Sequence, residues 1–281
     1  MEMNLRTLLK ISRPRFWLYL AGPFLVAYAL GASQHAQFFS LHFWVYFLYF
    51  LIPANIFLYG INDLSDTDTD QFNVRKNSYE HTLQSSQQQP LKRVLVVCVA
   101  ITVLVALFTA DVIAALLLLL LMGLSFAYSA PPLRWKARPF IDSASNVLYA
   151  VPGIFAYYVL TGALLSVGAV LTIACWTAAM HLFSAIPDID ADARSGLRTS
   201  AVVLGERRSV IVCSMLWLSC MVGAFLLTAS PLSFLLAMYV LIPLWSFVPG
   251  WSIARLYPMF PYLNAGLGGV LFWIIIVQRF L

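Results

Sequence analysis

Acidic residues in this chain of 281 residues gather in two short clusters, each directly after a long apolar segment. The first cluster has the sequence NDLSDTDTD and runs from Asn62 to Asp70. If a helix continues through it, Asp63, Asp66 and Asp70 stand at positions i, i+3 and i+7 and project from one face. Asn62 lies at the edge of that face, whereas Asp68 is turned away from it.

The second cluster, DIDAD, runs from Asp188 to Asp192. A helix places these two carboxylates on one face, because they are four residues apart, while Asp190 points elsewhere. A single acidic run after an apolar helix is usually a solvated loop. Two runs, each with helical facing and each followed by basic residues, favour a metal site instead. Crowded carboxylates repel one another, and they suit Mg²⁺, which commonly takes one or two carboxylates together with substrate phosphate oxygens.

The segments that carry the clusters are apolar enough to cross a membrane. Hydrophobic residues make up 61% of the chain and charged residues only 10%, against roughly 25% charged residues in soluble domains. One spanning helix needs about 20 apolar residues. We therefore expect an all-α integral membrane protein of nine transmembrane helices, forming one domain over residues 1–281. The predicted spans are residues 14–33, 41–61, 92–110, 112–130, 140–161, 165–187, 208–228, 231–250 and 258–278.

The positive charges predict the orientation of these spans. Sixteen of the seventeen Lys and Arg residues fall at the N-terminus or in every second connection, and only Arg279 falls on the other side. Because cytoplasmic loops carry the excess of Lys and Arg, we expect a cytoplasmic N-terminus, an outside C-terminus and a location in the cell inner membrane. The net charge of +5 is thus a topology signal and indicates no nucleic-acid partner.

The two clusters resemble the paired motifs of the UbiA-type intramembrane prenyltransferases, NDxxDxxxD after the second helix and DxxxD after the sixth. The segment YSAPPLRWK at 128–136 resembles the family's segment after the fourth helix, and TSAVVLGERR at 199–208 resembles its turn into the seventh. A narrower likeness, to the lycopene elongases of C50 carotenoid synthesis, rests on FLIPANIFLYGIND at 50–63, NVRK at 73–76 and RPFID at 138–142. The resemblance implies a nine-helix bundle with a central cavity that opens near the cytoplasmic face.

The resemblance also implies the reaction. A prenyl group, a C5 dimethylallyl group in the elongases, passes from an allylic diphosphate to a lipid-soluble acceptor after the allylic C–O bond ionises. Mg²⁺ stabilises the charge that develops on the leaving diphosphate. The metal ligands implied are Asn62, Asp63, Asp66, Asp70, Asp188 and Asp192. The residues implied to clamp the diphosphate are Arg75, Lys76, Arg134, Lys136, Arg194 and Arg198, with Arg75 and Lys136 preferred. The alternative role for these six cations is to anchor the membrane interface or the topology.

Four polar residues inside predicted spans are expected to line the substrate cavity, because a polar residue within a span usually faces the bundle interior. These residues are Asn55, Tyr59, Tyr128 and His181. Asn55 and Tyr59 share the face of Asn62, and His181 lies seven residues before Asp188, on its face. The alternatives are a tyrosine of the interfacial belt at position 128 and a packing histidine at position 181.

The acceptor expected from the resemblance is lycopene or a related carotenoid. A quinone-precursor aromatic acid, chlorophyllide or a glycerophosphate lipid remains an alternative, because reactions with these acceptors use the same aspartate clusters. A different class is a cation transporter whose carboxylates bind the transported ion. Both clusters lie at one membrane face, however, whereas transporter sites lie typically near the midplane.

Overall fold

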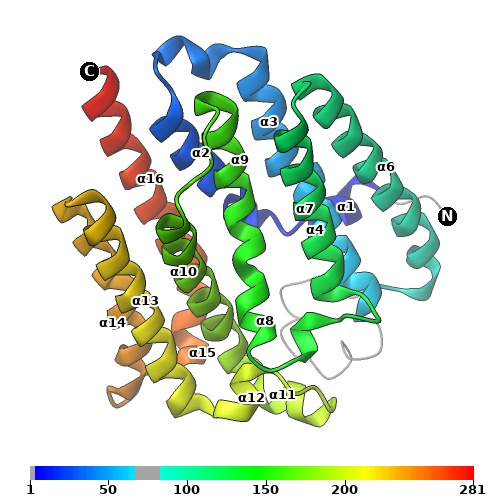
Figure 1. Ribbon diagram of the computed structural model, residues 1–281. Helices are drawn as coiled ribbons and strands as arrows, with labels where there is room; N and C mark the ends of the chain where they lie inside the picture. Colours follow the sequence, from blue (N-terminus) through cyan, green and yellow to red (C-terminus); the bar gives the residue numbers. More distant parts are fainter. Residues whose placement is uncertain (1–3, 67–82) are drawn as a thin grey trace. The chain divides into compact units, whose positions relative to one another are not determined.

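The computed structural model describes residues 4–66 and 83–281, and all regular elements in these residues are helices (Figure 1). Within them, seven helices are long and apolar enough to cross a membrane. They are Leu41–Ser65, Ser85–Thr109, Val112–Ser129, Ile141–Thr161, Val167–Arg194, Glu206–Thr228 and Ile253–Phe280. Two further predicted spans fall on shorter helices, α2 (Leu18–Gly31) and Pro231–Phe247. The all-α prediction is confirmed for the described residues, whereas the count of nine spans is not.

The second predicted span is broken in its middle. Helices α3 (Leu41–Leu51) and α4 (Pro53–Ser65) meet at Ile52, because a proline has no N–H and its ring clashes with the carbonyl of the preceding turn. The side-chain nitrogen of Asn55 donates to the carbonyl oxygens of Phe50 at 2.8 Å and Leu51 at 3.0 Å. These bonds satisfy backbone groups that the break would otherwise leave unpaired in an apolar environment.

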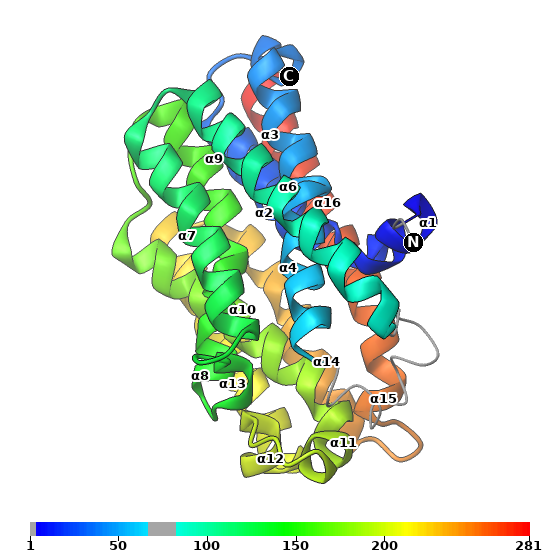
Figure 2. The ribbon, with the colours of Figure 1, turned by 90° about the vertical axis from the view of Figure 1, so that its right-hand side faces the viewer.

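The contacts divide the chain into two compact units, and the first comprises residues 1–133, 151–164 and 268–281. In this unit α2 packs against α9 (Val151–Thr161), and α4 packs against both α6 (Ser85–Thr109) and α7 (Val112–Ser129), as Figures 1 and 2 show. A Cβ atom added at Gly153 of α9 would lie 3.2 Å from the backbone oxygen of Pro23. The absence of a side chain at Gly153 thus lets the two helices approach closely, as small residues commonly do in membranes.

This close approach gives a prediction for stability. Gly153→Val is expected to destabilise the protein by about 2 kcal/mol, because the added side chain must push backbone atoms of α2 away. Gly123 of α7 is a matched control, since no atom lies within 4 Å of a Cβ added there. Gly123→Val should therefore change the free energy of unfolding by less than about 0.5 kcal/mol. Thermal unfolding in detergent measures both, and equal losses would contradict the packing described.

The second unit comprises residues 134–150 and 165–267. Here α10 (Val167–Ala185) packs against α13 (Glu206–Thr228), which in turn packs against α14 (Ala237–Leu244). Trp217 is fully buried at the centre of an aromatic cluster that includes Phe183 and Phe260. Outward-facing residues such as Leu171 and Leu226 are exposed, as expected for helices whose outer faces contact lipid. The prediction of a single domain over residues 1–281 stays a prediction.

Short helices gather at one end of the second unit. Two of them, α8 (Ile141–Ala144) and α11 (Ile189–Arg194), contact α12 (Ser200–Leu204) (Figure 1). A third, α15 (Ile253–Leu256), contacts the 3₁₀ turn η6 (Ile186–Asp188). The second aspartate cluster lies in η6 and α11 and therefore belongs to this end.

Candidate active site

The first cluster is built around Asp63, whose carboxylate is 1% exposed in the last turn of α4. Arg13 donates from Nη2 to Asp63 Oδ1 at 2.8 Å. The guanidinium carbon of Arg13 also lies 4.8 Å from the centre of the Tyr59 ring, one turn before Asp63, at a distance typical of a cation–π contact. A carboxylate this deeply buried requires a partner, and Arg13 provides it.

Sequence reasoning missed Arg13 as a site residue. In the sequence, Arg13 is only one of the positive charges at the N-terminus. Its contact with Asp63 is not evident there, because fifty residues separate the two. The backbone of Arg13 is left-handed, with φ 51°, between α1 (Leu5–Ile11) and the 3₁₀ turn η1 (Pro14–Phe16). This turn brings Arg13 to the end of α4. The available signal was a cation next to a helix-breaking proline at the start of an apolar segment.

The helix that carries the first cluster ends earlier than predicted. Helix α4 stops at Ser65, and Asp66 follows as its C-cap with φ −108° and ψ 4°. The prediction that one continuous helix places Asp63, Asp66 and Asp70 on a single face is therefore wrong, because α4 does not continue past Ser65. Carboxylates are unfavourable at the negative end of a helix, and the Ser65 hydroxyl donates to the Ile61 carbonyl at 2.8 Å, in competition with the backbone. Asp66 is nevertheless 9% exposed, so two buried carboxylates lie within one turn. The predicted residues Asp68, Asp70, Arg75 and Lys76 lie outside the described residues.

The other predicted residues of the first unit lie on α4, the helix of Asp63, or near the end of α7. Asn62 accepts a hydrogen bond at 3.4 Å from Ser129 Oγ at the end of α7, beside the half-buried Tyr128. Tyr59 is 7% exposed, and Asn55 is fully buried two turns before Asn62. The side-chain nitrogen of Asn55 donates to carbonyl oxygens at the break between α3 and α4. Asn55 therefore has a structural role besides its predicted role in the cavity.

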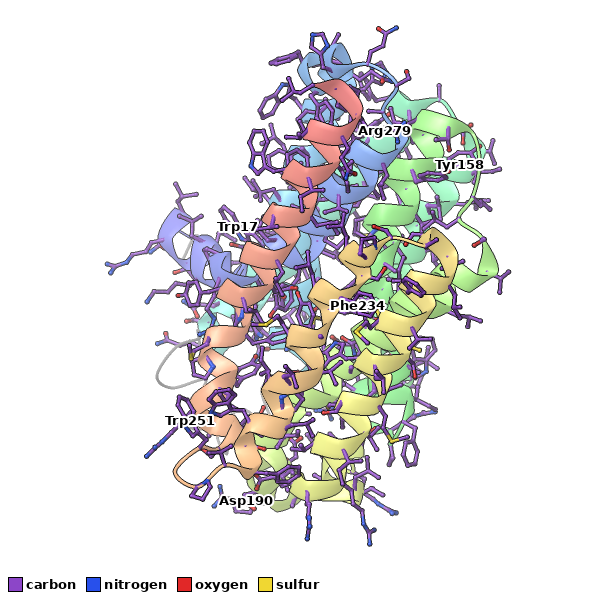
Figure 3. The ribbon with its side chains drawn as sticks, turned by 90° about the vertical axis from the view of Figure 1, so that its left-hand side faces the viewer. Trp17, Tyr158, Asp190, Phe234, Trp251 and Arg279 are labelled. Atoms are coloured by element: carbon purple, nitrogen blue, oxygen red, sulfur yellow. The ribbon has the colours of Figure 1, made fainter. Side chains whose placement is uncertain are left out.

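The second cluster has the predicted facing. Asp188 ends η6 and Asp192 lies in α11, and both are half-buried, whereas Asp190 between them is exposed. Figure 3 shows Asp190 at the edge of the second unit. Asp192 Oδ2 accepts a hydrogen bond at 3.2 Å from Thr199 Oγ1, which ties α11 to the start of α12. The two carboxylates that the sequence assigns to metal binding are thus less exposed than the carboxylate of Asp190 between them.

The predicted cations of the second unit differ in exposure. Arg194, in the last turn of α11, and Arg198 are both exposed. Arg134 and Lys136 are half-buried around the 3₁₀ turn η4 (Trp135–Ala137), and Arg134 has a left-handed backbone with φ 38°. Burial therefore favours Lys136 and Arg134 over the other two as residues that face a ligand.

Another acidic residue, Asp142, lies outside the two clusters and forms a buried network that the sequence did not predict. It is fully buried in α8, and its carboxylate accepts hydrogen bonds from the backbone N–H of Ser200 at 2.6 Å, the backbone N–H of Ser143 at 2.7 Å and the Ser200 hydroxyl. His181 Nε2 on α10 lies 3.9 Å from Asp142 Oδ2. Ionisable residues within spans are rare and commonly functional, and that signal was available for Asp142 in the predicted span 140–161.

The sequence model of the UbiA prenyltransferase family matches residues 20–275 of the chain. The chain belongs to the UbiA prenyltransferase family. This confirms the resemblance, and the UbiA chain is therefore an integral membrane prenyltransferase, which excludes the transporter alternative.

The chain is also similar to individual members of this family and to a solved structure. The UbiA chain is 40% identical to the lycopene elongase/hydratase of Haloferax volcanii over 258 residues, which are 92% of this chain and 84% of that protein. It is 30% identical to the lycopene elongase/hydratase of Corynebacterium glutamicum over an alignment of 287 positions, which covers 96% of each chain. Its fold matches that of a UbiA homologue from Archaeoglobus fulgidus, solved with GPP and Mg²⁺, with a TM-score of 0.74 at 21% identity over 96% of this chain and 99% of that one.

The chemistry of the site follows from its acidic residues. Within residues 4–66 and 83–281, no group of three or more His, Cys, Asp or Glu side chains could hold a metal ion unaided. The buried pair Asp63 and Asp66 instead fits a hard cation that completes its coordination shell with ligand oxygens and water, which is how Mg²⁺ usually binds.

Proposed function

We propose that this UbiA prenyltransferase transfers a C5 dimethylallyl group from dimethylallyl diphosphate to lycopene or a related carotenoid and releases diphosphate. The observation that carries the acceptor is the likeness to lycopene elongase/hydratases, which extends over nearly the whole chain. The likeness of the motif RPFID supports it further, because its last residue, Asp142, is the centre of a buried network.

Each aspartate cluster is proposed to bind Mg²⁺ together with diphosphate oxygens. Asp63 and Asp66, together with Asp70 and with Asn62 at the edge, hold one Mg²⁺ through the diphosphate, and Asp188 and Asp192 hold another. Mg²⁺ supplies electrostatic stabilisation of the charge on the leaving group. The clamp is formed by Arg75, Lys76, Arg134, Lys136, Arg194 and Arg198, with Arg13 added because it already pairs with Asp63.

The acceptor is an apolar polyene, so the bond-forming step takes place without a charged nucleophile. The terminal double bond of the carotenoid attacks the dimethylallyl cation, and a new carbon–carbon bond and a tertiary cation result. Loss of a proton, or capture of water followed by loss of a proton, ends the reaction. The residues proposed to contact the acceptor are Asn55, Tyr59 and Tyr128 in the first unit and His181 in the second.

The membrane orientation is part of the proposal and rests on the distribution of Lys and Arg. With a cytoplasmic N-terminus and an outside C-terminus in the cell inner membrane, both aspartate clusters face the cytoplasm. A reporter enzyme that is active only outside the membrane should be active when fused after Leu281 and inactive when fused after Arg208. The opposite pattern would reverse the orientation.

The acceptor is tested by expressing the chain in a bacterium that accumulates lycopene, followed by mass analysis of the pigments. Lycopene extended by one or two C5 units, present with the wild type and lost with Asp63→Asn, is the expected result. Unchanged lycopene in cells that contain the inserted protein would contradict the carotenoid acceptor. A quinone-precursor aromatic acid, chlorophyllide or a glycerophosphate lipid would then be tried with the same donor.

A further inference from the structure

The buried contact between His181 and Asp142 calls for a chemical explanation. The His181 side chain is 13% exposed, and Asp142 is fully buried. Their closest atoms, Nε2 and Oδ2, are 3.9 Å apart, which is longer than a hydrogen bond. Asp142 does not need the imidazole as a donor, because both of its oxygens already accept bonds from Ser143 and Ser200. The imidazole is therefore not part of the hydrogen-bonding frame that holds this carboxylate.

The hydrogen bonds that the described residues donate to Asp142 bring no positive charge to it. The donors, two backbone N–H groups and one hydroxyl, are all neutral. A buried carboxylate favours a positive charge close to it, and His181 is the titratable cation partner that lies near it among the described residues. Protonation of His181 would complete a buried ion pair, so the charge of Asp142 favours the imidazolium.

His181 lies on the same span as the second acidic cluster, but nearer the middle of the span. It precedes Asp188 by seven residues within Val167–Arg194, which is about two helical turns, or about 10 Å, toward the apolar middle. A diphosphate held at Asp188 leaves its prenyl chain to extend in that direction. The carbocation formed on the acceptor would then develop away from the aspartates and closer to His181.

We infer that His181, with Asp142 as its positioning residue, accepts the proton that ends the prenyl transfer. The inference rests on the proposed function. In the elimination route, a C–H bond next to the tertiary cation breaks, its electron pair forms the new C=C bond, and the proton goes to a ring nitrogen of neutral His181. In the hydration route, a water oxygen bonds to the cation and the same nitrogen takes one of its protons. Asp142 stabilises the imidazolium in both routes until the proton passes to diphosphate or water.

The two roles expected for His181 from the sequence are a place in the lining of the substrate cavity and a place in packing. Its position beside a buried carboxylate distinguishes these roles. A carboxylate beside an imidazole is the arrangement that orients and strengthens a general base. Contacts of this kind are often long before substrate binds, which is consistent with 3.9 Å.

The test compares His181→Gln with the wild type in membranes supplied with lycopene, dimethylallyl diphosphate and Mg²⁺. Glutamine keeps a polar N–H donor of similar reach but accepts no proton. Diphosphate release and elongated carotenoid are measured separately. We expect His181→Gln to form elongated product about a hundredfold more slowly, with the donor KM unchanged and with diphosphate release falling much less. Without a base, the tertiary cation breaks its new C–C bond again and returns lycopene and the dimethylallyl cation. Water captures the dimethylallyl cation as dimethylallyl alcohol, and the proton lost from that water goes to diphosphate.

Two further variants separate chemistry from structure. Ser200→Ala removes one hydroxyl bond to Asp142 while its backbone N–H still donates, so it should lower thermal stability but keep the ratio of product to diphosphate released. His181→Ala with added imidazole should recover elongated product, because a free base can enter the vacated volume. Recovery by imidazole would not occur if His181 served packing alone.

The outcomes are distinct. An unchanged ratio of product to diphosphate in His181→Gln would overturn the inference, and so would a parallel loss of both that imidazole does not relieve in His181→Ala. If the wild type itself releases diphosphate without elongating lycopene, the carotenoid acceptor fails, and this inference fails with it. A defect confined to the His181 variants leaves the proposed function standing and identifies the base.

Discussion

Replacement of Asp63 by asparagine is expected to slow diphosphate release by about a thousandfold, which corresponds to about 4 kcal/mol of lost transition-state stabilisation. Asparagine has nearly the same shape and can still accept the hydrogen bond from Arg13, so the substitution removes mainly the negative charge. Without that charge the site loses a ligand for Mg²⁺. The measurement is diphosphate release at saturating dimethylallyl diphosphate and Mg²⁺.

A matched control lies in the same unit. Asp111 caps the start of α7, where its carboxylate accepts from the backbone N–H of Ala114 and from the Tyr158 hydroxyl. Asparagine is as good an N-cap as aspartate, so Asp111→Asn should retain activity within about twofold. A comparable loss in both variants would mean that the effect of Asp63→Asn comes from stability and not from metal binding.

Much of the fold could be predicted from apolar segments, because their lengths and the turns between them are local properties of the sequence. Both ends of α7 and α13 lie within two residues of the predicted ones, and so does the C-terminal end of α6, whereas α6 begins at Ser85, seven residues before the predicted start at residue 92. The departures have local causes that compete with hydrophobicity. Pro53 breaks the second span in its middle, and α2 is short because the chain first forms a 3₁₀ turn at Pro14.

The candidate site was predicted where its geometry is local and missed where it is not. The facing of Asp188, Asp190 and Asp192 follows from helical periodicity alone, and the exposures agree with it. The partner of Asp63 depends on a left-handed turn at Arg13, which periodicity cannot indicate. The early end of α4 depends on charge repulsion at the helix terminus, which apolar patterns do not report.

Asp142 shows the same limit over a longer distance. Its main partner, Ser200, is 58 residues away in the sequence, and His181 comes from a third helix. The rarity of a buried acid within a span could have identified it as functional. Its role as the centre of a network that joins α8, α10 and α12 could come only from the structure.

Arg279 is an exception to the rule that Lys and Arg lie on the cytoplasmic side, and a local contact accounts for it. It is the one basic residue predicted to lie on the outer side, and its side chain donates to the carbonyl oxygen of Leu30 near the end of α2. Figure 3 shows it near the C-terminal end of the chain. A cation at the carbonyl end of a helix is favourable, so Arg279 has a local reason for its place.

Asp188→Asn is expected to reduce turnover by about a hundredfold to a thousandfold, because it removes a half-buried carboxylate that we assign to the second Mg²⁺. The loss should be accompanied by a rise in the Mg²⁺ concentration that gives half-maximal activity. That rise distinguishes a lost ligand from a general defect, since a destabilised protein would show less activity at every Mg²⁺ concentration without a shift in the midpoint.

Asp190 offers a control only two residues away, with the same side chain in the same acidic run. Because it is exposed, Asp190→Asn changes the net charge of the cluster as much as Asp188→Asn does, yet it removes no inward ligand. We expect it to keep activity within about twofold and to leave the Mg²⁺ midpoint unchanged. Equal losses in the two variants would mean that the cluster acts through its total charge and not through the inward face that helical spacing and burial assign to Asp188.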